Sequence, residues 1–368
     1  MRQSLPLLAG IFAIMALSNA IVPVLPSFAE EAIWIQSTIF SAYFLGAFLT
    51  VLPAGVIADR VGNVLLIRTG LFLTLASGVA IVAFPFALPV FIARCIEGIG
   101  AGLFVSSALS WVNSQTDHVR LSGHFIAALN LGLVSGLLGT GWLAESAGRL
   151  GGMVLFTAIA GISLISILVV KKSEADLRAR GDVRSIIAAN FWLFLSAVIL
   201  TGITGVVTAL YPEYTGESAA LLSIQIGTMY TATIITSIIA PRLPLQPVPT
   251  IRLSAVAMAA GLFWCYLAPP FGTIAVFAGF AVIGGFAGFA INAQLAFLAE
   301  SGVKQGSVMG LYNTSTYAGL TFLPFFAGII TELDLFAPDR FLPAFLVMAL
   351  ITASMAYFIG RCTCRRAG

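Results

Sequence analysis

The sequence predicts an all-α integral membrane protein with twelve transmembrane helices in two six-helix bundles, related by a pseudo-two-fold axis along the membrane normal. Of its 368 residues, 59% are hydrophobic and 9% charged, and the mean hydropathy is +1.03. A soluble core of this size does not hide so much apolar surface. The apolar runs are continuous and near the roughly 20 residues of a membrane-crossing helix, which favours helices over barrel strands. The third observation is a repeat of the first half in the second.

The expected helices are the apolar runs between polar breaks. They cover residues 5–26, 33–57, 64–84, 88–112, 122–143, 151–170, 186–210, 219–240, 251–268, 272–298, 306–330 and 341–360. The first run continues to Pro26 and takes part in the repeat. We therefore expect it to remain as a helix and not to be cleaved as a signal peptide.

The distribution of basic residues predicts the orientation in the membrane. With the amino terminus in the cytoplasm, fifteen of the eighteen Lys and Arg residues fall on the cytoplasmic side. The positive-inside rule then places both termini in the cytoplasm of a multi-pass plasma-membrane protein. The net charge of +3 follows from this topology and does not indicate a nucleic-acid partner.

The chain divides at KKSEADLRARGDVRS, its longest charge-rich stretch. We expect an N-terminal six-helix bundle at residues 1–170, a cytoplasmic linker at 171–185, and a C-terminal six-helix bundle with a short basic tail at 186–368.

The second half repeats the first in the same orientation. One constant shift along the chain brings Gly98 onto Gly284, and a slightly shorter shift brings Asn130 onto Asn313. The small difference between the two shifts means that one loop is shortened, and loops tolerate such changes in length. Parallel repeats with a site between them at mid-depth are the plan of rocker-type secondary transporters.

Four motifs resemble those of the major facilitator superfamily. GVIADRVG, residues 55–62, is similar to the signature G-x-x-x-D-R/K-x-G between helices 2 and 3, and RCIEGIGAG, residues 94–102, resembles R-x-x-Q-G-x-G of helix 4. GLVSGLLGTG, residues 132–141, partly matches the helix 5 motif of exporters, G-x-x-x-G-P-x-x-G-G, with Leu137 in place of Pro and Thr140 in place of one Gly. IVPVLP, residues 21–26, is similar to the end of helix 1 in drug:proton antiporters, although the helix 1 acid of several such relatives is absent. The pattern is closest to this multidrug efflux branch.

The resemblance implies a cytoplasmic gate at the turn after the second helix. Gly55, Asp59, Arg60 and Gly62 occupy the signature positions. In the resembled family this turn contacts helix 11 across the two halves and latches the gate in the outward-open state. Asn63 and the residue after it stand where bases are usual, which implies a weaker latch.

Arg94 and Glu97 are the candidates for proton coupling. They lie about 9 and 13 Å below the outer boundary, and their i,i+3 spacing puts them on one helix face. Charges at this depth must be paired or face water, so we expect them to face the interior between the halves, and each other. Burial favours a neutral carboxyl group, whereas arginine favours the ionised form, so Glu97 can bind and release a proton as hydration changes. The alternative is a static ion pair that fixes packing.

Polar residues within the helices are the candidate substrate contacts. Asn313 and Tyr317 share a helix face, whereas Asn292 and the glutamine two residues later do not. The full set is Asn19, Arg94, Asn130, Asn292, Asn313 and Tyr317. Each amide also has an alternative role in hydrogen bonding between helices, which membrane Asn and Gln commonly provide.

Glycines spaced by four residues form two small-residue faces. They are Gly98 with Gly102, and Gly132 with Gly136. Close helix packing alone explains them. A gating role, in which these faces slide as the halves rock, is an inference from the resembled family.

These features favour a secondary active transporter that moves a small organic molecule by alternating access, with proton-coupled efflux as the leading hypothesis. An importer or facilitator of a small metabolite is the alternative, and a non-transporting receptor or scaffold is the alternative from another class. We expect a monomer in the lipid bilayer, with protons as the coupling ion and without a cofactor. There is no nucleotide-binding G-x-x-x-x-G-K-[ST] motif.

The sequence gives no indication of an enzyme or a metal site. His118 and His124 lack the H-E-x-x-H spacing of a zinc hydrolase. Cys362 and Cys364 form a C-x-C pair without histidine partners, which is weak support for metal binding.

Overall fold

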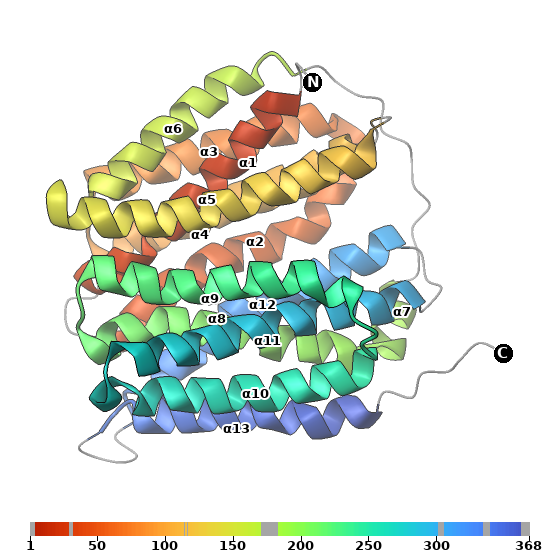
Figure 1. The fold of residues 1–368 in the computed structure, drawn as a ribbon. Coiled ribbons are helices and arrows are strands. Elements are labelled where there is room, and N and C mark those ends of the chain that lie inside the picture. Colours follow the sequence, from red (N-terminus) through yellow and green to blue (C-terminus); the bar gives the residue numbers. More distant parts are fainter. Residues whose placement is uncertain are drawn as a thin grey trace. The chain divides into compact units, whose positions relative to one another are not determined.

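The computed structural model describes residues 4–28, 32–113, 115, 117–170, 183–300, 305–333 and 339–361, and every regular element in these ranges is a helix. Within these ranges, the structure describes only the backbone of residues 55, 56, 59, 60, 113, 118, 119, 183–185, 299, 300, 305–308 and 361. The predicted all-α class is confirmed (Figure 1).

The helices follow the expected order. Those of the first half are α1 (Ser4–Ala20), η1 (Val22–Phe28), α2 (Ile33–Val61), α3 (Asn63–Ala83), α4 (Ala87–Asn113), α5 (His118–Ser146) and α6 (Gly151–Ile167). Those of the second half are α7 (Val183–Ala189), α8 (Phe191–Thr215), α9 (Ala219–Ile239), α10 (Pro247–Leu267), α11 (Thr273–Glu300), α12 (Gln305–Ile330) and α13 (Leu342–Phe358). Short 3₁₀ turns follow α9, α10 and α13, at Ala240–Arg242, Pro269–Phe271 and Ile359–Arg361.

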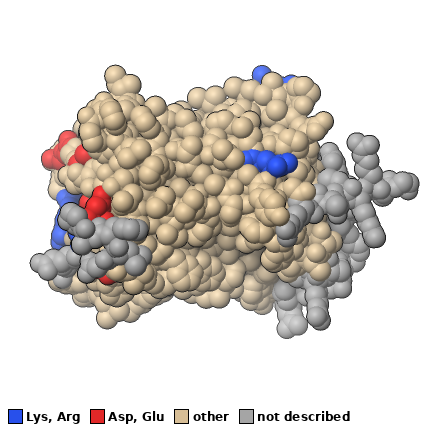
Figure 2. All heavy atoms as spheres, turned by 90° about the horizontal axis from the view of Figure 1, so that it is seen from below, with Lys and Arg blue, Asp and Glu red and all other residues tan. Residues whose placement is uncertain are grey.

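Eight helices of the described chain are long and apolar enough to cross a membrane, and α1 with η1 makes a ninth if the bent pair is one span. α6 and α13 are apolar helices of 17 residues each. α12 has 26 residues and is more polar, with six hydroxyl or amide side chains between Asn313 and Thr321. Together these helices account for the twelve expected spans. On the face that α10 and α13 cover, the visible acidic side chains gather at one end, and most of the surface between the ends is uncharged (Figure 2).

Two predicted helices differ from the structure. The first ends at Ala20, and the chain bends by 44° into the 3₁₀ helix η1, because Pro23 and Pro26 have no N–H to continue an α-helix. The helix expected at 186–210 is interrupted at Asn190, whose side-chain amide donates to the carbonyl oxygen of Ile186 at 3.1 Å. The expected linker at 171–185 lies outside the described residues, except for the start of α7.

The chain forms two compact units. Unit 1 comprises Met1–Ala179 and Gly216–Ile224, and unit 2 comprises Arg180–Thr215 and Gln225–Gly368. In unit 1, α4 packs against α2 and α3, and α1 packs against α5. In unit 2, α8 packs against α12, and α10 packs against α11 and α13. The core of unit 1 includes the fully buried side chains of Ile11, Leu71 and Phe104.

The internal packing of unit 1 recurs in unit 2. A Cβ atom on Gly98 of α4 would lie 1.8 Å from the carbonyl oxygen of Tyr43 of α2, and one on Gly284 of α11 would lie 2.0 Å from that of Met229 of α9. The shift that relates Tyr43 to Met229 is the same as the one that relates the two glycines. The glycine faces therefore make equivalent backbone contacts in both units, as the repeat predicts.

A loop carboxylate fastens the start of α13 in unit 2. Asp339 accepts hydrogen bonds from the backbone N–H groups of Phe341 at 2.9 Å and Leu342 at 3.2 Å, and from the hydroxyl of Tyr266. Partial burial acts to raise the pKa of Asp339, but these hydrogen bonds hold the pKa below its ordinary value. The ionised carboxylate thus ties α10 to the beginning of α13.

Candidate functional site

The candidate site is the ion pair between Arg94 and Glu97 in α4. Nη1 of Arg94 lies 2.8 Å from Oε2 of Glu97, and the two side chains are 1% and 0% exposed. Glu97 lies ten residues into α4, roughly 15 Å along the helix, near the middle of an approximately 30 Å hydrocarbon core. The i,i+3 spacing brings the two charges together on one turn, as the sequence suggested.

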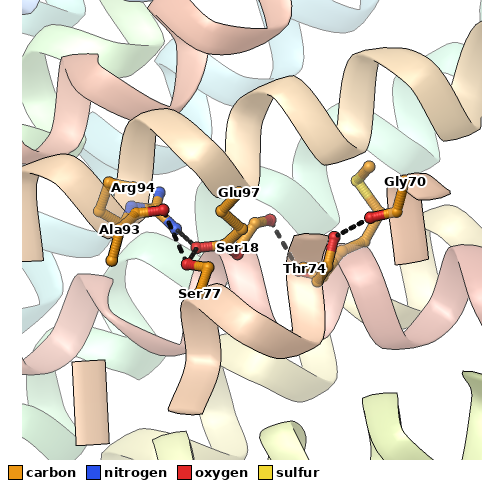
Figure 3. Close-up of polar contacts among 8 residues, drawn as sticks. Ser18, Gly70, Thr74, Ser77, Ala93, Arg94 and Glu97 are labelled. Carbon is orange, nitrogen blue, oxygen red and sulfur yellow. Dashed lines mark hydrogen bonds and ion pairs between the residues drawn. The ribbon is translucent and has the colours of Figure 1, made fainter. Parts of the chain in front are cut away.

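Neighbouring helices of unit 1 enclose the pair. The guanidinium of Arg94 lies over the ring of Tyr43 of α2, with Cζ 4.6 Å from the ring centroid. From α3, the hydroxyl of Ser77 donates to the carbonyl oxygen of Ala93 at 2.8 Å and lies 3.5 Å from Oε2 of Glu97 (Figure 3). These contacts place the charges against α2 and α3 of their own unit. The expected position facing the interior between the halves stays a prediction.

The pair is not fully satisfied. Among the described residues, neither Oε1 of Glu97 nor Nε of Arg94 has a hydrogen-bond partner, although both atoms are buried. Removing one partner of a buried ion pair costs about 3–5 kcal/mol, because the other charge is left uncompensated. Oε1 is the oxygen that can take a proton without first displacing Arg94. The arrangement can therefore hold either an ionised pair or a protonated acid beside a cation.

Hydroxyl groups on the adjacent helix turns are already occupied. Ser18 of α1 donates to the carbonyl oxygen of Met15, and Thr74 of α3 donates to that of Gly70, both at 3.0 Å (Figure 3). A hydroxyl that donates within its own helix keeps lone pairs to accept another hydrogen bond.

The side-chain amides of three predicted substrate contacts bond to backbone carbonyls. Asn19 is buried, and its amide donates to the carbonyl oxygen of Leu133 of α5 at 3.1 Å, so it links two helices. The amides of Asn130 and Asn292 each donate at 2.9 Å to a carbonyl four residues earlier in their own helix. Both are half-buried, as are Asn313 and Tyr317 on α12.

A buried polar network in unit 2 was not among the predicted sites. Nε2 of Gln294 of α11 donates to the hydroxyl oxygen of Ser196 of α8 at 3.0 Å, and Oε1 accepts from the hydroxyl of Tyr312 of α12, also at 3.0 Å. Sequence reasoning set Gln294 aside because it lies two residues from Asn292. The available signal was a glutamine in an apolar helix, which needs partners on both ends of its amide.

The predicted gating glycines pack helices together. Cβ atoms on Gly102, Gly132 and Gly136 would lie 2.1, 2.5 and 2.0 Å from atoms of Thr50, Phe12 and Ala16. Gly62, with φ of 91°, forms the turn between α2 and α3. Gly55, Asp59 and Arg60 lie in α2, and their side chains are outside the described residues.

A duplicated helical bundle with a charged pair at mid-membrane depth is typical of polytopic membrane transporters. The sequence profile of the Major Facilitator Superfamily matches residues 7–324. The chain therefore belongs to this superfamily and is a secondary transporter of small molecules.

Solved structures share the fold at low sequence identity. A D-xylose–proton symporter is 14% identical with a TM-score of 0.79, and the alignment covers 98% of this chain and 97% of that one. The nucleoside transporter NupG is 14% identical with a TM-score of 0.76, covering 98% and 99%. The POT family transporter PepTSo is 10% identical with a TM-score of 0.79, covering 98% and 97%. A comparison with curated protein sequences finds none that matches.

Proposed function

We propose that this protein exports a small organic molecule in exchange for protons, with Glu97 as the proton-binding group. The observation that carries the proposal is the fully buried Arg94–Glu97 pair, in which one carboxylate oxygen has no hydrogen-bond partner among the described residues. Ionisable groups inside the membrane are expensive to keep, and they commonly mark ion pathways.

The coupling follows from competition for the Glu97 carboxylate. In the ionised state Glu97 neutralises Arg94 across 2.8 Å. When a proton binds Oε1, the attraction weakens, and the face of Tyr43 holds the guanidinium by a cation–π interaction. Hydration that differs between outward-open and inward-open states then decides which form is favoured.

The export direction rests on the motifs at residues 21–26 and 132–141, which resemble those of efflux proteins. Import or facilitated diffusion is the second candidate. This alternative is supported by a difference from the exporter motif, which has a proline where this chain has Leu137. In this chain α5 runs as one helix through that position. Among the polar candidates, the half-buried Asn130, Asn292, Asn313 and Tyr317 are the proposed substrate contacts.

The gate is proposed at the turn after α2. The protein is proposed to lie in the plasma membrane with both termini on the cytoplasmic side. The substitution Asp59→Asn is expected to preserve folding and insertion, to shift the population toward the inward-open state and to slow transport. Accessibility of single cysteines placed at the ends of the helices measures this population. Unchanged accessibility on both membrane faces would contradict the latch.

Proton coupling is tested in liposomes with an imposed pH gradient and a pH-sensitive dye. A thermal-shift panel of small organic molecules first identifies a substrate, because a ligand of the native state raises its apparent stability. Substrate-dependent proton movement is expected in wild type and in Glu145→Gln, a matched control at an exposed acid near the end of α5. The movement should disappear in Glu97→Gln, and a thermal unfolding curve must show that this variant, which leaves Arg94 uncompensated, is still folded.

Each other outcome assigns a different function. Undiminished coupling in Glu97→Gln removes this residue from the mechanism. Downhill substrate flux without proton movement indicates a facilitator, and proton movement in the same direction as the substrate indicates a symporter. Neither flux in a folded, substrate-binding protein indicates a receptor or scaffold.

A further inference from the structure

An apolar groove of about 680 Å³ lies in unit 1 where α3 begins and α6 ends. Leu65, Leu168 and Val169 form walls that are more than half exposed, and Val64 and Val170 form a buried floor. The volume falls within the roughly 300–1,000 Å³ range of ligand sites. In a membrane protein, exposed apolar walls beside the helix ends meet lipid at the boundary of the hydrocarbon core.

The cation of the groove is Arg68 of α3. Its Nη2 donates to the carbonyl oxygens of Leu168 at 2.7 Å and Val170 at 3.1 Å, at the carboxyl end of α6. Both bonds use one nitrogen, and the guanidinium has five N–H donors. The carbonyl groups are uncharged, and no carboxylate among the described residues pairs with Arg68.

A corresponding arginine contact occurs in unit 2. It allows the structural role of the arginine to be tested separately from the groove. Nε of Arg252 of α10 donates to the carbonyl oxygen of Ala356 near the end of α13 at 2.9 Å. Arg252 follows Arg68, and Ala356 follows Val170, by nearly the shift that relates the two halves of the chain. In each unit an arginine thus holds the carboxyl end of the sixth transmembrane helix. A variant at Arg252 removes a comparable contact at a residue that does not line the groove.

We propose that this groove binds an anionic phospholipid, with the phosphate at Arg68 and an acyl chain along Leu65, Leu168 and Val169. Arginine recognises phosphate through paired N–H donors, and basic pockets between membrane helices are suited to anionic headgroups. The apolar walls require a ligand with a hydrocarbon part, which a free anion lacks. The site combines both halves of a phospholipid's chemistry at the membrane boundary.

The bound lipid would contact the turn between α2 and α3. Val61 and Gly62 line the groove, and Gly62 makes this turn with a positive φ of 91°. An occupant therefore packs against the end of the signature segment at residues 55–62. Through this contact, the anionic lipid content of the membrane can influence the gate, independently of whether transport is coupled to protons.

The test is native mass spectrometry of the purified protein with phosphatidylglycerol or phosphatidylcholine of identical acyl chains. Wild type should retain phosphatidylglycerol preferentially. Arg68→Gln should weaken phosphatidylglycerol binding by about fivefold, from the loss of one base near an anionic headgroup. Arg252→Gln should bind as wild type does. Val169→Trp, which fills the groove and leaves Arg68 in place, should reduce retention of both lipids.

Further arms separate the lipid from a free anion and from a folding defect. Inorganic phosphate at millimolar concentration should not displace phosphatidylglycerol, and displacement would indicate a simple anion site and overturn the proposal. Equal phosphatidylglycerol retention by wild type, Arg68→Gln and Val169→Trp would also overturn it. If Arg68→Gln unfolds, Arg68→Lys and Val169→Trp decide the question, with a thermal unfolding curve for each variant. Normal retention by folded Val169→Trp then refutes the groove.

Discussion

Replacing Gly98 by alanine tests whether the contact between α2 and α4 holds unit 1 together. The added Cβ would lie 1.8 Å from the carbonyl oxygen of Tyr43 and 2.7 Å from its carbonyl carbon. Ordinary van der Waals contact begins near 3.4 Å, almost twice the shorter of these distances, so the helices must separate at this point. Both opposing atoms belong to the backbone and cannot rotate away. Overpacking of this kind costs about 1–3 kcal/mol.

Separation of α2 from α4 also moves Tyr43 away from Arg94. The ring centroid now lies 4.6 Å from Cζ of Arg94, and the cation–π attraction is effective within about 6 Å. Gly98→Ala should therefore lower the apparent melting temperature, and it should also weaken proton coupling if the proposed role of Tyr43 holds. The first effect is measured by heating the protein in detergent and using size-exclusion chromatography to quantify the fraction that remains folded. The liposome assay measures the second.

The matched control is Gly123→Ala on α5. A Cβ at Gly123 has no neighbouring atom within 4 Å, and its backbone is helical. Alanine there should be neutral or should stabilise the helix by about 0.5–1 kcal/mol. Equal melting temperatures for Gly98→Ala and Gly123→Ala would refute the close-contact reasoning.

Two further predictions concern unit 2. Gln294→Leu should lower the free energy of unfolding by about 1–2 kcal/mol, because Tyr312 and Ser196 lose a buried partner, and Tyr312→Phe should have about half that effect. Unfolding curves that match wild type would show that this network does not join the helices. Because the folded-state pKa of Asp339 is lowered, its contribution to stability is present above the unfolded value of about 3.9 and is lost as the pH falls through the folded pKa. The melting temperature should fall less steeply below about pH 4 in Asp339→Asn than in wild type, and parallel curves would contradict this.

The positions of the helices could be predicted because each depends on local composition. A run of apolar residues can satisfy its backbone in the membrane only by forming a helix. Departures occur where single residues act locally, as at Pro23, which ends α1, and at Asn190, which interrupts the seventh expected span. The pairing of Arg94 with Glu97 was also predictable, because an i,i+3 spacing fixes two side chains on one helix face.

The partners from other helices were not predictable in this way. Tyr43 and Ser77 belong to helices that precede Arg94 in the chain, and nothing in the helical period states which faces of α2 and α3 meet α4. The repeat gave a partial indication, since equivalent glycines mark equivalent contacts in the two units. It does not identify the atom that each glycine approaches.

By itself, the sequence determined the membrane environment, the order of the helices, the duplicated plan and the charged pair within one turn. These properties follow from composition and from the helical period, which act within one segment. Only the tertiary structure decided that Tyr43 covers Arg94, that Gln294 joins three helices and that Arg68 lines an apolar groove. Such contacts depend on the packing of segments that are distant along the chain, and that packing selects one of many pairings that the local pattern allows equally.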